Sequence, residues 1–254
     1  MSSHSSQNVD RRVALISDIH GNLPALRAVM ADIEAEGISR IWCLGDLVGY
    51  GASPDECVAL AAERFELCLI GNHDLAALGN LDIAEFSPAA AESAVWTRNR
   101  LGEDAMAYLG GLGYQDSVGP IGLWHASPRD AIWEYVLSTL PAGECMDAMS
   151  TRLGAIGHSH VALWFCRRAG EGLPDGEPAL AGTTRDLSTG TWLLNPGAVG
   201  QPRDGDPRAA WLMLDLDGPR AFWHRVPYGI GEAAAAIREA GLPASLAERL
   251  YYGQ

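Results

Sequence analysis

The chain has 254 residues, of which 48% are hydrophobic and 20% charged, a balance that excludes a disordered or fibrous protein. No apolar run is long enough to cross a bilayer, and residues 1–10 are polar with nothing like a secretory signal, so we expect a cytoplasmic protein without membrane association. The formal net charge of -14, with arginine but no lysine, repels polyanions and argues against long nucleic acids as partners.

The first part of the chain alternates strand patterns with helix patterns. An apolar run at residues 13–17 precedes apolar residues at helical spacing over 23–33, and Gly37 marks the end of that helix. The same order recurs, with strands at 38–44 and 65–70 followed by helices at 54–64 and 75–78. Repeated units of this kind predict an α/β fold with a largely parallel sheet covered by helices.

The rest of the chain predicts further helices and strands. Residues 87–109 read as a helical block that begins at Ser87 and Pro88. Residues 169–190, rich in Gly, Pro and Thr, are expected to form a loose hairpin or a surface loop. Strands are expected at 121–124, 153–156, 192–194, 209–214 and 221–226, and helices at 232–240 and after Pro243.

The cysteines and the domain organisation give two further expectations. The five cysteines are widely spaced and none lies in a Cys-x-x-Cys pair, which argues against a disulfide framework and a thiolate zinc site. No linker or internal repeat interrupts the chain, so we expect a flexible leader at residues 1–10 and a single domain at residues 11–254. Nothing in the sequence indicates an oligomeric state.

Polar side chains follow the predicted strands, each at a strand's carboxyl end. They are Asp18 and His20 (SDIHGN), Asp46 (GDLVGY), Asn72, His73 and Asp74 (GNHD), His125 (WHASP), and His158 and His160 (GHSH). In open α/β sheets the loops at this edge converge on the ligand. We therefore expect these side chains to lie close together.

Each of these residues taken alone has a simpler explanation. A single Asp or Asn after a strand is typically an N-cap or turn residue, and a single His such as His125 is typically a hydrogen-bonded, half-buried side chain. His158 and His160 point to one side of an extended segment, which suits metal binding but also occurs by chance. The coincidence at successive strand ends favours one shared site.

The residue types indicate which metals the site would hold. Carboxylate, amide and imidazole ligands without thiolate suit Mn²⁺, which we favour, as well as Fe, Zn²⁺, Co²⁺ or Ni²⁺. Seven candidate ligands are too many for one tetrahedral ion and about right for two divalent ions that share a bridging carboxylate. Two such ions would outweigh the charges of Asp18 and Asp46 and so attract an anionic substrate to an acidic protein.

At these residues the sequence resembles the calcineurin-like metallophosphoesterase superfamily, whose motifs run D-x-H, G-D, G-N-H-D/E, a later His and G-H-x-H. The match covers residues 13–160 in order, and residues 195–209 (NPGAVGQPRDGDPRA) resemble the bacterial branch of YfcE-type phosphodiesterases. The resemblance implies two facing mixed β-sheets flanked by helices, with the metals at the strand carboxyl ends. It also implies metal-dependent hydrolysis of phosphodiesters or phosphomonoesters.

Carried over to this chain, the resemblance implies a role for each residue. The first metal would be held by Asp18, His20 and His160, the second by Asn72, His125 and His158, and Asp46 would bridge them. A hydroxide shared by both ions would attack phosphorus. His73 would donate a proton to the leaving group or stabilise the transition state, and Asn72 would also contact the substrate. That substrate would be a small phosphate ester, with a nucleotide as one option.

The chain departs from two groups in the superfamily. Protein phosphatases and diadenosine tetraphosphatases extend the G-D motif with a phosphate-binding Arg, and the protein phosphatases add an Asp that orients the catalytic His. Here the stretch reads Leu47, Val48, Gly49 and Tyr50. Dinucleoside tetraphosphatase and protein serine/threonine phosphatase activities therefore remain only as alternatives, beside a non-catalytic metal-binding scaffold for a protein partner.

Three other residues have two interpretations each. Asp74 either orients His73 or caps the next helix. Arg203 either replaces the missing phosphate clamp, because a guanidinium can hold two phosphoryl oxygens, or pairs with a surface carboxylate such as Asp204. The tryptophans, Trp133 included, read as packing residues, although Trp124 next to His125 could line the site.

Overall fold

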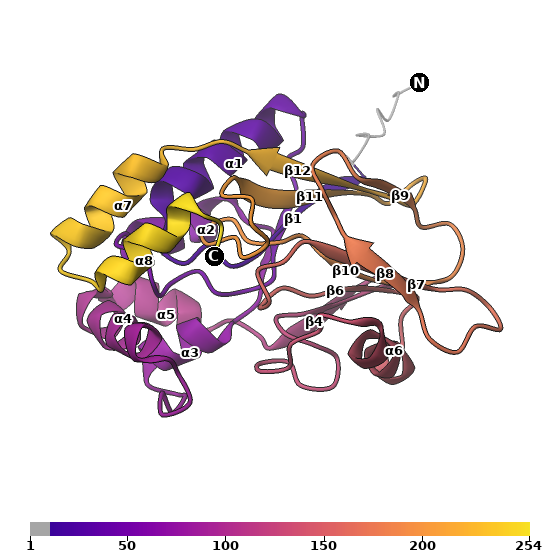
Figure 1. Cartoon of the computed structure of the whole chain (residues 1–254), viewed down its shortest axis with the longest axis horizontal. Helices are drawn as coiled ribbons and strands as arrows, with labels where there is room; N and C mark the ends of the chain where they lie inside the picture. The colour runs from indigo at the N-terminus through magenta and orange to yellow at the C-terminus, as the bar shows by residue number, and fades with distance from the viewer. Residues whose placement is uncertain (1–10) are drawn as a thin grey trace, which may run out of the picture.

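Two six-stranded mixed β-sheets face each other in the computed structural model of the protein, which describes residues 11–254 (Figure 1). The first sheet has the order β3 (Leu67–Cys68), β2 (Ile41–Cys43), β1 (Arg12–Ile16), β11 (Ala209–Asp215), β12 (Arg220–Val226), β9 (Thr184–Asp186). The second has the order β4 (Gln115–Val118), β5 (Ile121–Trp124), β6 (Leu153–Ala155), β10 (Thr191–Asn195), β7 (Leu163–Arg167), β8 (Asp175–Pro178). The expected α/β fold of two facing mixed sheets is confirmed.

The predicted strand and helix repeats form one half of the first sheet. β1, β2 and β3 run parallel and are linked by helices α1 (Leu23–Ala35) and α2 (Pro54–Arg64). α1 begins at Asn22, whose side-chain oxygen accepts the Ala25 N–H at 3.2 Å, and it ends before Gly37, which has a left-handed φ of 70°. β11, β12 and β9 extend this sheet in antiparallel fashion, so only half of it is parallel.

Alternation along the strands explains the layers of the core. In β1, Val13 and Leu15 pack between the two sheets, whereas Ala14 and Ile16 pack against the helices on the other face. Full burial of side chains such as these contributes about 1.5–3 kcal/mol each. The outer face of the second sheet is covered by α6 (Thr139–Ala148), at the bottom of Figure 1.

Two segments differ from the sequence prediction. The helical block at 87–109 is two helices, α4 (Pro88–Arg100) and α5 (Glu103–Gly110), because Leu101 is extended and the Gly102 N–H donates to Asp55 Oδ1 at 2.9 Å. The stretch 169–190 is not a hairpin, since β8 pairs with β7 in the second sheet while β9 pairs with β12 in the first.

Three elements are additional to those predicted, and each has a weak sequence signal. β4 is polar and largely exposed. α6 contains Pro141 and Gly143, which interrupt its helical pattern. β7 is buried along most of its length and so lacks the alternation of a half-buried strand.

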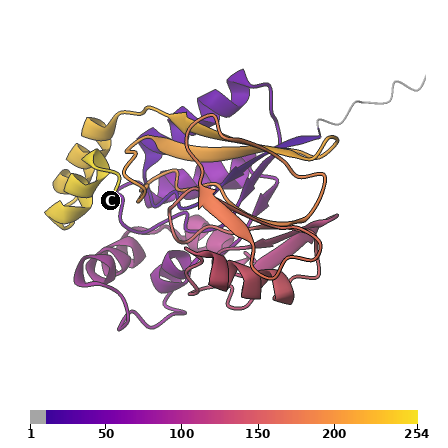
Figure 2. The same ribbon diagram turned by 45° about the vertical axis from the view of Figure 1, so that its right-hand side comes forward.

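The remaining helices gather at one end of the sheets. They are α3 (Asn72–Leu78), α7 (Ile230–Glu239), α8 (Ala244–Glu248) and a 3-10 turn at Arg249–Tyr251. With α4 and α5 they lie at the left of Figure 1, and Figure 2 shows the same end of the molecule from a second direction. α3 begins at Asn72 rather than Leu75, which places the GNHD residues in its first turn. Within residues 11–254 no helix is long and apolar enough to cross a membrane, and the expected leader lies outside this range.

Candidate metal centre

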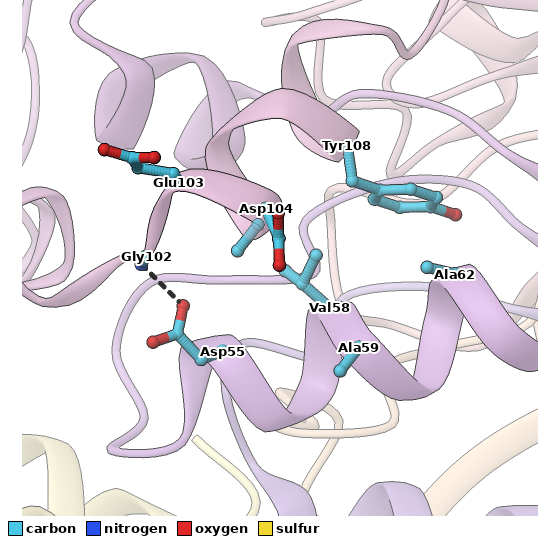
Figure 3. A pocket seen from close by; sticks show the side chains of 9 residues that line it. Asp55, Val58, Ala59, Ala62, Gly102, Glu103, Asp104 and Tyr108 are labelled. Carbon is cyan, nitrogen blue, oxygen red and sulfur yellow. Dashed lines mark hydrogen bonds between the residues drawn. The ribbon is translucent and has the colours of Figure 1, made fainter.

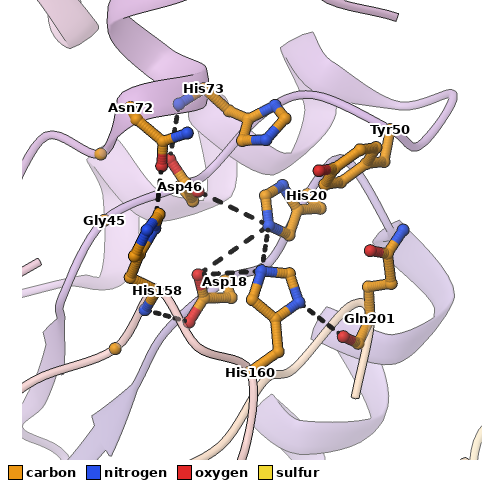
Figure 4. Close-up of polar contacts among 12 residues, drawn as sticks. Asp18, His20, Gly45, Asp46, Tyr50, Asn72, His73, His158, His160 and Gln201 are labelled. Atoms are coloured by element: carbon orange, nitrogen blue, oxygen red, sulfur yellow. Dashed lines mark hydrogen bonds and ion pairs between the residues drawn. The ribbon is translucent and has the colours of Figure 1, made fainter. Parts of the chain in front are cut away.

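The polar residues predicted from the sequence meet where strands of both sheets end (Figure 4). The first sheet supplies one set, after β1, β2 and β3: Asp18, His20, Asp46, Asn72 and His73. The second sheet supplies the other set, after β5 and β6: His125, His158 and His160. The site is therefore built from the carboxyl ends of strands in two different sheets.

The side chains form two groups that share Asp46. The first contains ligand atoms of Asp18, His20, Asp46 and His160, and the second those of Asp46, His125 and His158, with the atoms of each group within 4.8 Å of one another. Asn72 lies in the second group, since its Oδ1 is 3.1 Å from His125 Nε2 and 3.1 Å from His158 Nδ1. The structure thus brings together all the residues expected to bind metal.

Hydrogen bonds behind the site orient three of the histidines. The Nδ1–H groups of His20, His125 and His160 donate to the carbonyls of Val48, Leu44 and Gln201, at 3.0, 2.8 and 2.6 Å. Because carbonyl oxygens can only accept, Nε2 carries a lone pair in each ring that is neutral, as His20 and His160 are because burial lowers their pKa. The Nε2 atoms of His20 and His160 lie 3.1 Å apart, so two lone pairs face each other.

Carboxylate oxygens point into the same spaces. Asp18 Oδ1 and Asp46 Oδ2 are buried and have no hydrogen-bond partner among the described residues. They lie 3.4 Å from His160 Nε2 and 3.4 Å from His125 Nε2, respectively. In the first group these buried acceptors converge without a donor and repel one another, and a cation between them removes the repulsion. In the second group a cation would replace the proton with which His125 faces Asp46. The donor set of carboxylate, imidazole and amide oxygen fits two divalent ions.

Five of the seven candidate ligands have a backbone conformation that non-glycine residues rarely adopt. Asp18, His20, Asp46, His158 and His160 have positive φ angles between 51° and 61°. Each such position costs on the order of 1 kcal/mol for a residue with a side chain. Backbone hydrogen bonds beyond the strand ends hold these loops, including Asp18 N–H to Gly45 O at 3.0 Å and His20 N–H to Asp46 O at 2.9 Å.

Asn195 has a positioning role that the sequence reasoning missed. Its buried side-chain amide donates to Gly157 O at 2.8 Å and to Ser159 Oγ at 3.0 Å, which fixes the loop that carries His158 and His160. The only signal in the sequence was its place in the NPGAVG stretch, which gave no role.

Burial and charge shift the ionisation of the site. Burial opposes the charged form of His125, but the Asp46 carboxylate outweighs it and raises the pKa of His125 to about 10. Burial favours the neutral form of Asp46, but His125 outweighs it and holds the pKa of Asp46 well below its usual range. Burial raises the pKa of Asp18 to about 7 and lowers the pKa of His158 to about 3. Asp46 is thus the fixed negative charge of the site.

His73 lies beside the two groups without joining either. Its backbone N–H donates to Asp46 Oδ1 at 2.9 Å, and its ring centroid lies 4.9 Å from that of His20 and 4.3 Å from that of Tyr50. The ring fits because residue 49 is glycine: a Cβ there would lie 2.6 Å from His73 Nδ1. Burial lowers the pKa of His73 to about 4, so the ring is neutral at neutral pH.

Asp74 caps helix α3 and does not orient His73. Its carboxylate accepts three backbone N–H groups, from Gly71 at 3.0 Å, Asp46 at 2.9 Å and Val48 at 3.0 Å. His73 Nδ1, by contrast, is buried without a hydrogen-bond partner in the described part of the chain. Of the two interpretations of Asp74, the cap is the one observed, and it ties the Asp46 loop to α3.

Arg203 lies next to the site and makes no ion pair within residues 11–254. Its Nη2 donates to Gln201 Oε1 at 3.0 Å and to the Tyr50 hydroxyl at 3.3 Å, and its Nε is buried without a partner in the same range. The surface carboxylate Asp204 pairs with Arg225 instead. The salt-bridge interpretation of Arg203 is therefore wrong. Its partner Tyr50 was not among the residues that the sequence predicted for the site.

Two other features lie away from this chemistry. A cleft of about 430 Å³ between α2 and α5 is lined by Asp55, Glu103 and Asp104, whose carboxylates repel an anionic substrate (Figure 3). Trp124 donates its indole N–H to Gln115 Oε1 at 3.0 Å and packs with residues of α6, so it does not line the metal centre.

Comparisons with known proteins identify relatives of this chain. Residues 12–218 match the sequence model of the calcineurin-like phosphoesterase superfamily domain. The chain is 35% identical to the uncharacterized protein MJ0912 of Methanocaldococcus jannaschii, over 97% of this chain and 100% of that protein. The crystal structure of a metallophosphoesterase from Sphaerobacter thermophilus is 42% identical, with a TM-score of 0.86 over 96% of this chain and 99% of that one.

A more distant structure has the same fold. The hypothetical protein PH1004 from Pyrococcus horikoshii OT3 is 19% identical, with a TM-score of 0.76 over 96% of this chain and 98% of that chain.

Proposed function

Because the chain belongs to the calcineurin-like phosphoesterase superfamily, we propose that it hydrolyses small phosphate esters with the aid of two divalent metal ions. One observation carries the proposal: buried carboxylate and imidazole acceptors converge in two groups that share Asp46. Phosphodiesters and phosphomonoesters, nucleotides among them, are the proposed substrates. Mn²⁺ is the favoured metal, with Fe, Zn²⁺, Co²⁺ or Ni²⁺ as alternatives.

The two groups would divide the metals as the superfamily resemblance implies. Asp18, His20 and His160 would hold one ion, Asn72, His125 and His158 the other, and Asp46 would lie between them. Two such ions would lower the pKa of a water molecule and offset the charge of a phosphoryl group.

Three side chains would act on the substrate directly. The neutral His73 ring would donate a hydrogen bond from its N–H to the leaving oxygen, and full proton transfer would require the ring to gain a proton first. Arg203 would donate to a phosphoryl oxygen through its unpartnered Nε, and the Asn72 amide nitrogen would donate to another. Tyr50 supports this arrangement because its hydroxyl holds the Arg203 guanidinium.

The alternative activities have less support. The Arg and Asp that mark tetraphosphatases and protein phosphatases are replaced by the Leu47 to Tyr50 stretch. A non-catalytic scaffold has no use for a guanidinium whose Nε is buried without a partner beside two groups of metal ligands. The five free cysteine thiols suit the reducing cytoplasm, which we propose as the compartment. The narrower resemblance to YfcE-type phosphodiesterases stays a prediction.

The test is removal and return of metal. Chelator-stripped protein should not hydrolyse 4-nitrophenyl phosphate or bis(4-nitrophenyl) phosphate, and Mn²⁺ should restore turnover as two equivalents bind. Undiminished turnover in a preparation shown by elemental analysis to be metal-free would refute the proposal. A metal-loaded protein that is inactive on these esters, nucleotides, dinucleoside tetraphosphates and phosphopeptides would favour the scaffold.

A further inference from the structure

Aromatic rings form a continuous row that includes His73 and His158. The His73 ring lies 4.3 Å from Tyr50 and 4.8 Å from Phe86, measured between centroids. Phe86 lies 5.6 Å from Trp133, Trp133 lies 6.5 Å from His158, and His158 lies 4.3 Å from Tyr135. We name Tyr50, Phe86, Trp133 and Tyr135 the aromatic collar. Its members come from three separate loops, after β2, between α3 and α4, and between β5 and α6.

The loop between β5 and α6 holds its collar residues in place without a ligand. The Trp133 N–H donates to Asp130 Oδ1 at 3.1 Å, and the Asp130 N–H donates to the buried Ser127 Oγ at 2.9 Å. Val136, next to Tyr135, is buried among residues of α6 and the second sheet. A surface that is already ordered loses little conformational entropy when it binds a ligand.

Packing alone does not account for Tyr135. Its ring covers His158, yet 50% of the residue is exposed. A single exposed aromatic residue is ordinary on a protein surface. Tyr135, however, ends a row of rings that begins at Tyr50, the partner of Arg203. The row contacts both candidate metal groups, because Tyr50 packs on His20 and Tyr135 packs on His158. Tyr135 therefore presents an exposed aromatic ring that only His158 separates from the place where a phosphoryl group would bind.

We propose that the aromatic collar binds a planar aromatic group of the phosphate ester, as the base of a mononucleotide is. The inference rests on the proposed function and narrows its substrates to nucleotides and related esters with an aromatic group. Stacking of one base on aromatic side chains changes affinity by roughly five- to a hundredfold and tolerates different bases, because every base has a π face. The acidic chain disfavours a longer polynucleotide in the same place.

The test compares two phosphonates that differ only in the base. Non-hydrolysable phosphonate analogues of adenosine 5′-monophosphate and ribose 5-phosphate are titrated calorimetrically into the full chain loaded with Mn²⁺. We expect the adenosine analogue to bind about tenfold or more tightly. Tyr135→Ala should lose most of this ratio, and Tyr135→Phe should keep it. Leu137→Ala, on the same loop and 53% exposed, is the matched control and should keep the ratio.

Each other outcome is decisive. Equal binding of the two analogues to the wild-type protein, or an unchanged ratio in Tyr135→Ala, overturns the inference while leaving the phosphoesterase proposal standing. A parallel loss of both affinities in Tyr135→Ala, together with metal, also overturns it, because the ring then only supports His158. If neither analogue binds the metal-loaded wild type, the proposed function fails as well.

Discussion

Asp46 has two side-chain oxygens with different partners. Oδ1 accepts the His73 N–H, whereas Oδ2 has no hydrogen-bond partner in the described chain and lies 3.6 Å from His20 Nε2 and 3.4 Å from His125 Nε2. One oxygen thus ties the carboxylate to helix α3, and the other faces both groups of candidate ligands. Asp46 Oδ1 packs directly against the backbone of Gly71, where a side chain would collide with it.

Asp46→Asn should remove the shared negative charge while keeping the side-chain shape. We expect the loss of one metal equivalent and a fall in turnover by several orders of magnitude, because a neutral amide bridges two cations poorly. Elemental analysis and turnover with Mn²⁺ measure the two effects. Retention of both metals would contradict the bridging role.

His73→Asn should separate chemistry from metal binding. His73 touches the groups through its backbone and its ring edge, but contributes no atom to either. We therefore expect two metals to remain bound while kcat falls by roughly a hundredfold or more, the scale of general acid and base catalysis. If the ring donates a proton, esters with acidic leaving alcohols should suffer least. A fall in metal content would instead make His73 a support of the ligands.

The residue types of the site could be predicted from the sequence, but their backbone could not. Side chains of Asp, Asn and His after successive strands were enough to predict two groups of ligands. The left-handed conformations of Asp18 and His160 follow from hydrogen bonds to loops distant in the sequence, which no local pattern encodes. The same holds for Asn195 and Tyr50, because their partners are apparent only in the folded chain.

At the scale of elements, the first turn of α3 joins two loops of the site. The Asp74 carboxylate accepts one N–H from the helix start and two from the loop after β2, so it links the helix to that loop. The sequence predicted the helix to begin at Leu75, because the apolar pattern that defines it begins there. Asp74, the capping residue, precedes that apolar pattern. Its hydrogen bonds to Asp46 and Val48 are apparent only in the folded chain.

Asp74→Ala should destabilise the protein by at least about 3 kcal/mol, because it leaves three backbone N–H groups without an acceptor. Denaturant unfolding of the metal-free variant measures this loss. Asp104→Ala, a carboxylate in the exposed first turn of α5, is the matched control and should change stability by about 0.5 kcal/mol or less. Equal effects of the two substitutions would show that Asp74 is an ordinary helix-start carboxylate.

β12 offers a pH-dependent contact outside the site. His224 stacks on Trp211 with centroids 3.9 Å apart, and burial lowers its pKa, although Asp32 at 3.5 Å acts in the opposite sense. A histidine with a lowered folded-state pKa binds fewer protons folded than unfolded. Its contribution to stability is therefore full above the ordinary pKa of about 6.5 and is lost as the pH falls below it.

We expect His224→Gln to reduce the drop in Tm between pH 7 and pH 5, because glutamine does not titrate. Thermal scans of both proteins in the presence of a chelator isolate this effect from metal binding. An identical pH dependence in wild type and variant would show that His224 gains its proton as easily folded as unfolded.

At the scale of the whole molecule, the centre lies where the two sheets meet. Each group of candidate ligands takes side chains from both, since Asp46 follows β2 while His125 and His160 follow strands of the other sheet. Metal bound there would join the sheets at one edge, in addition to the apolar cluster between them. A second feature at this scale is the net charge of -14, against which the centre would be a local positive region.

Metal should stabilise the whole fold. At a free Mn²⁺ concentration of about 100 times Kd, one site adds about 2.7 kcal/mol, which raises Tm by roughly 5–10 °C in a protein of this size. Calorimetric scans with and without Mn²⁺ measure the shift, and Asp46→Asn should show a smaller one. An unchanged Tm under conditions where metal binds would contradict this prediction, because it would mean that metal binds the unfolded chain as tightly as the folded one.

The division of the site between two sheets also governs the order of its appearance during synthesis. Asp18, Asp46 and Asn72 leave the ribosome early, whereas His158 and His160 emerge only with the second sheet, and the Gln201 carbonyl that orients His160 follows later still. A nascent chain therefore carries the carboxylates before it carries most of the imidazoles. Because the Gln201 carbonyl orients His160, we expect tight metal binding only after translation has passed residue 201, when metal would enter a nearly finished fold.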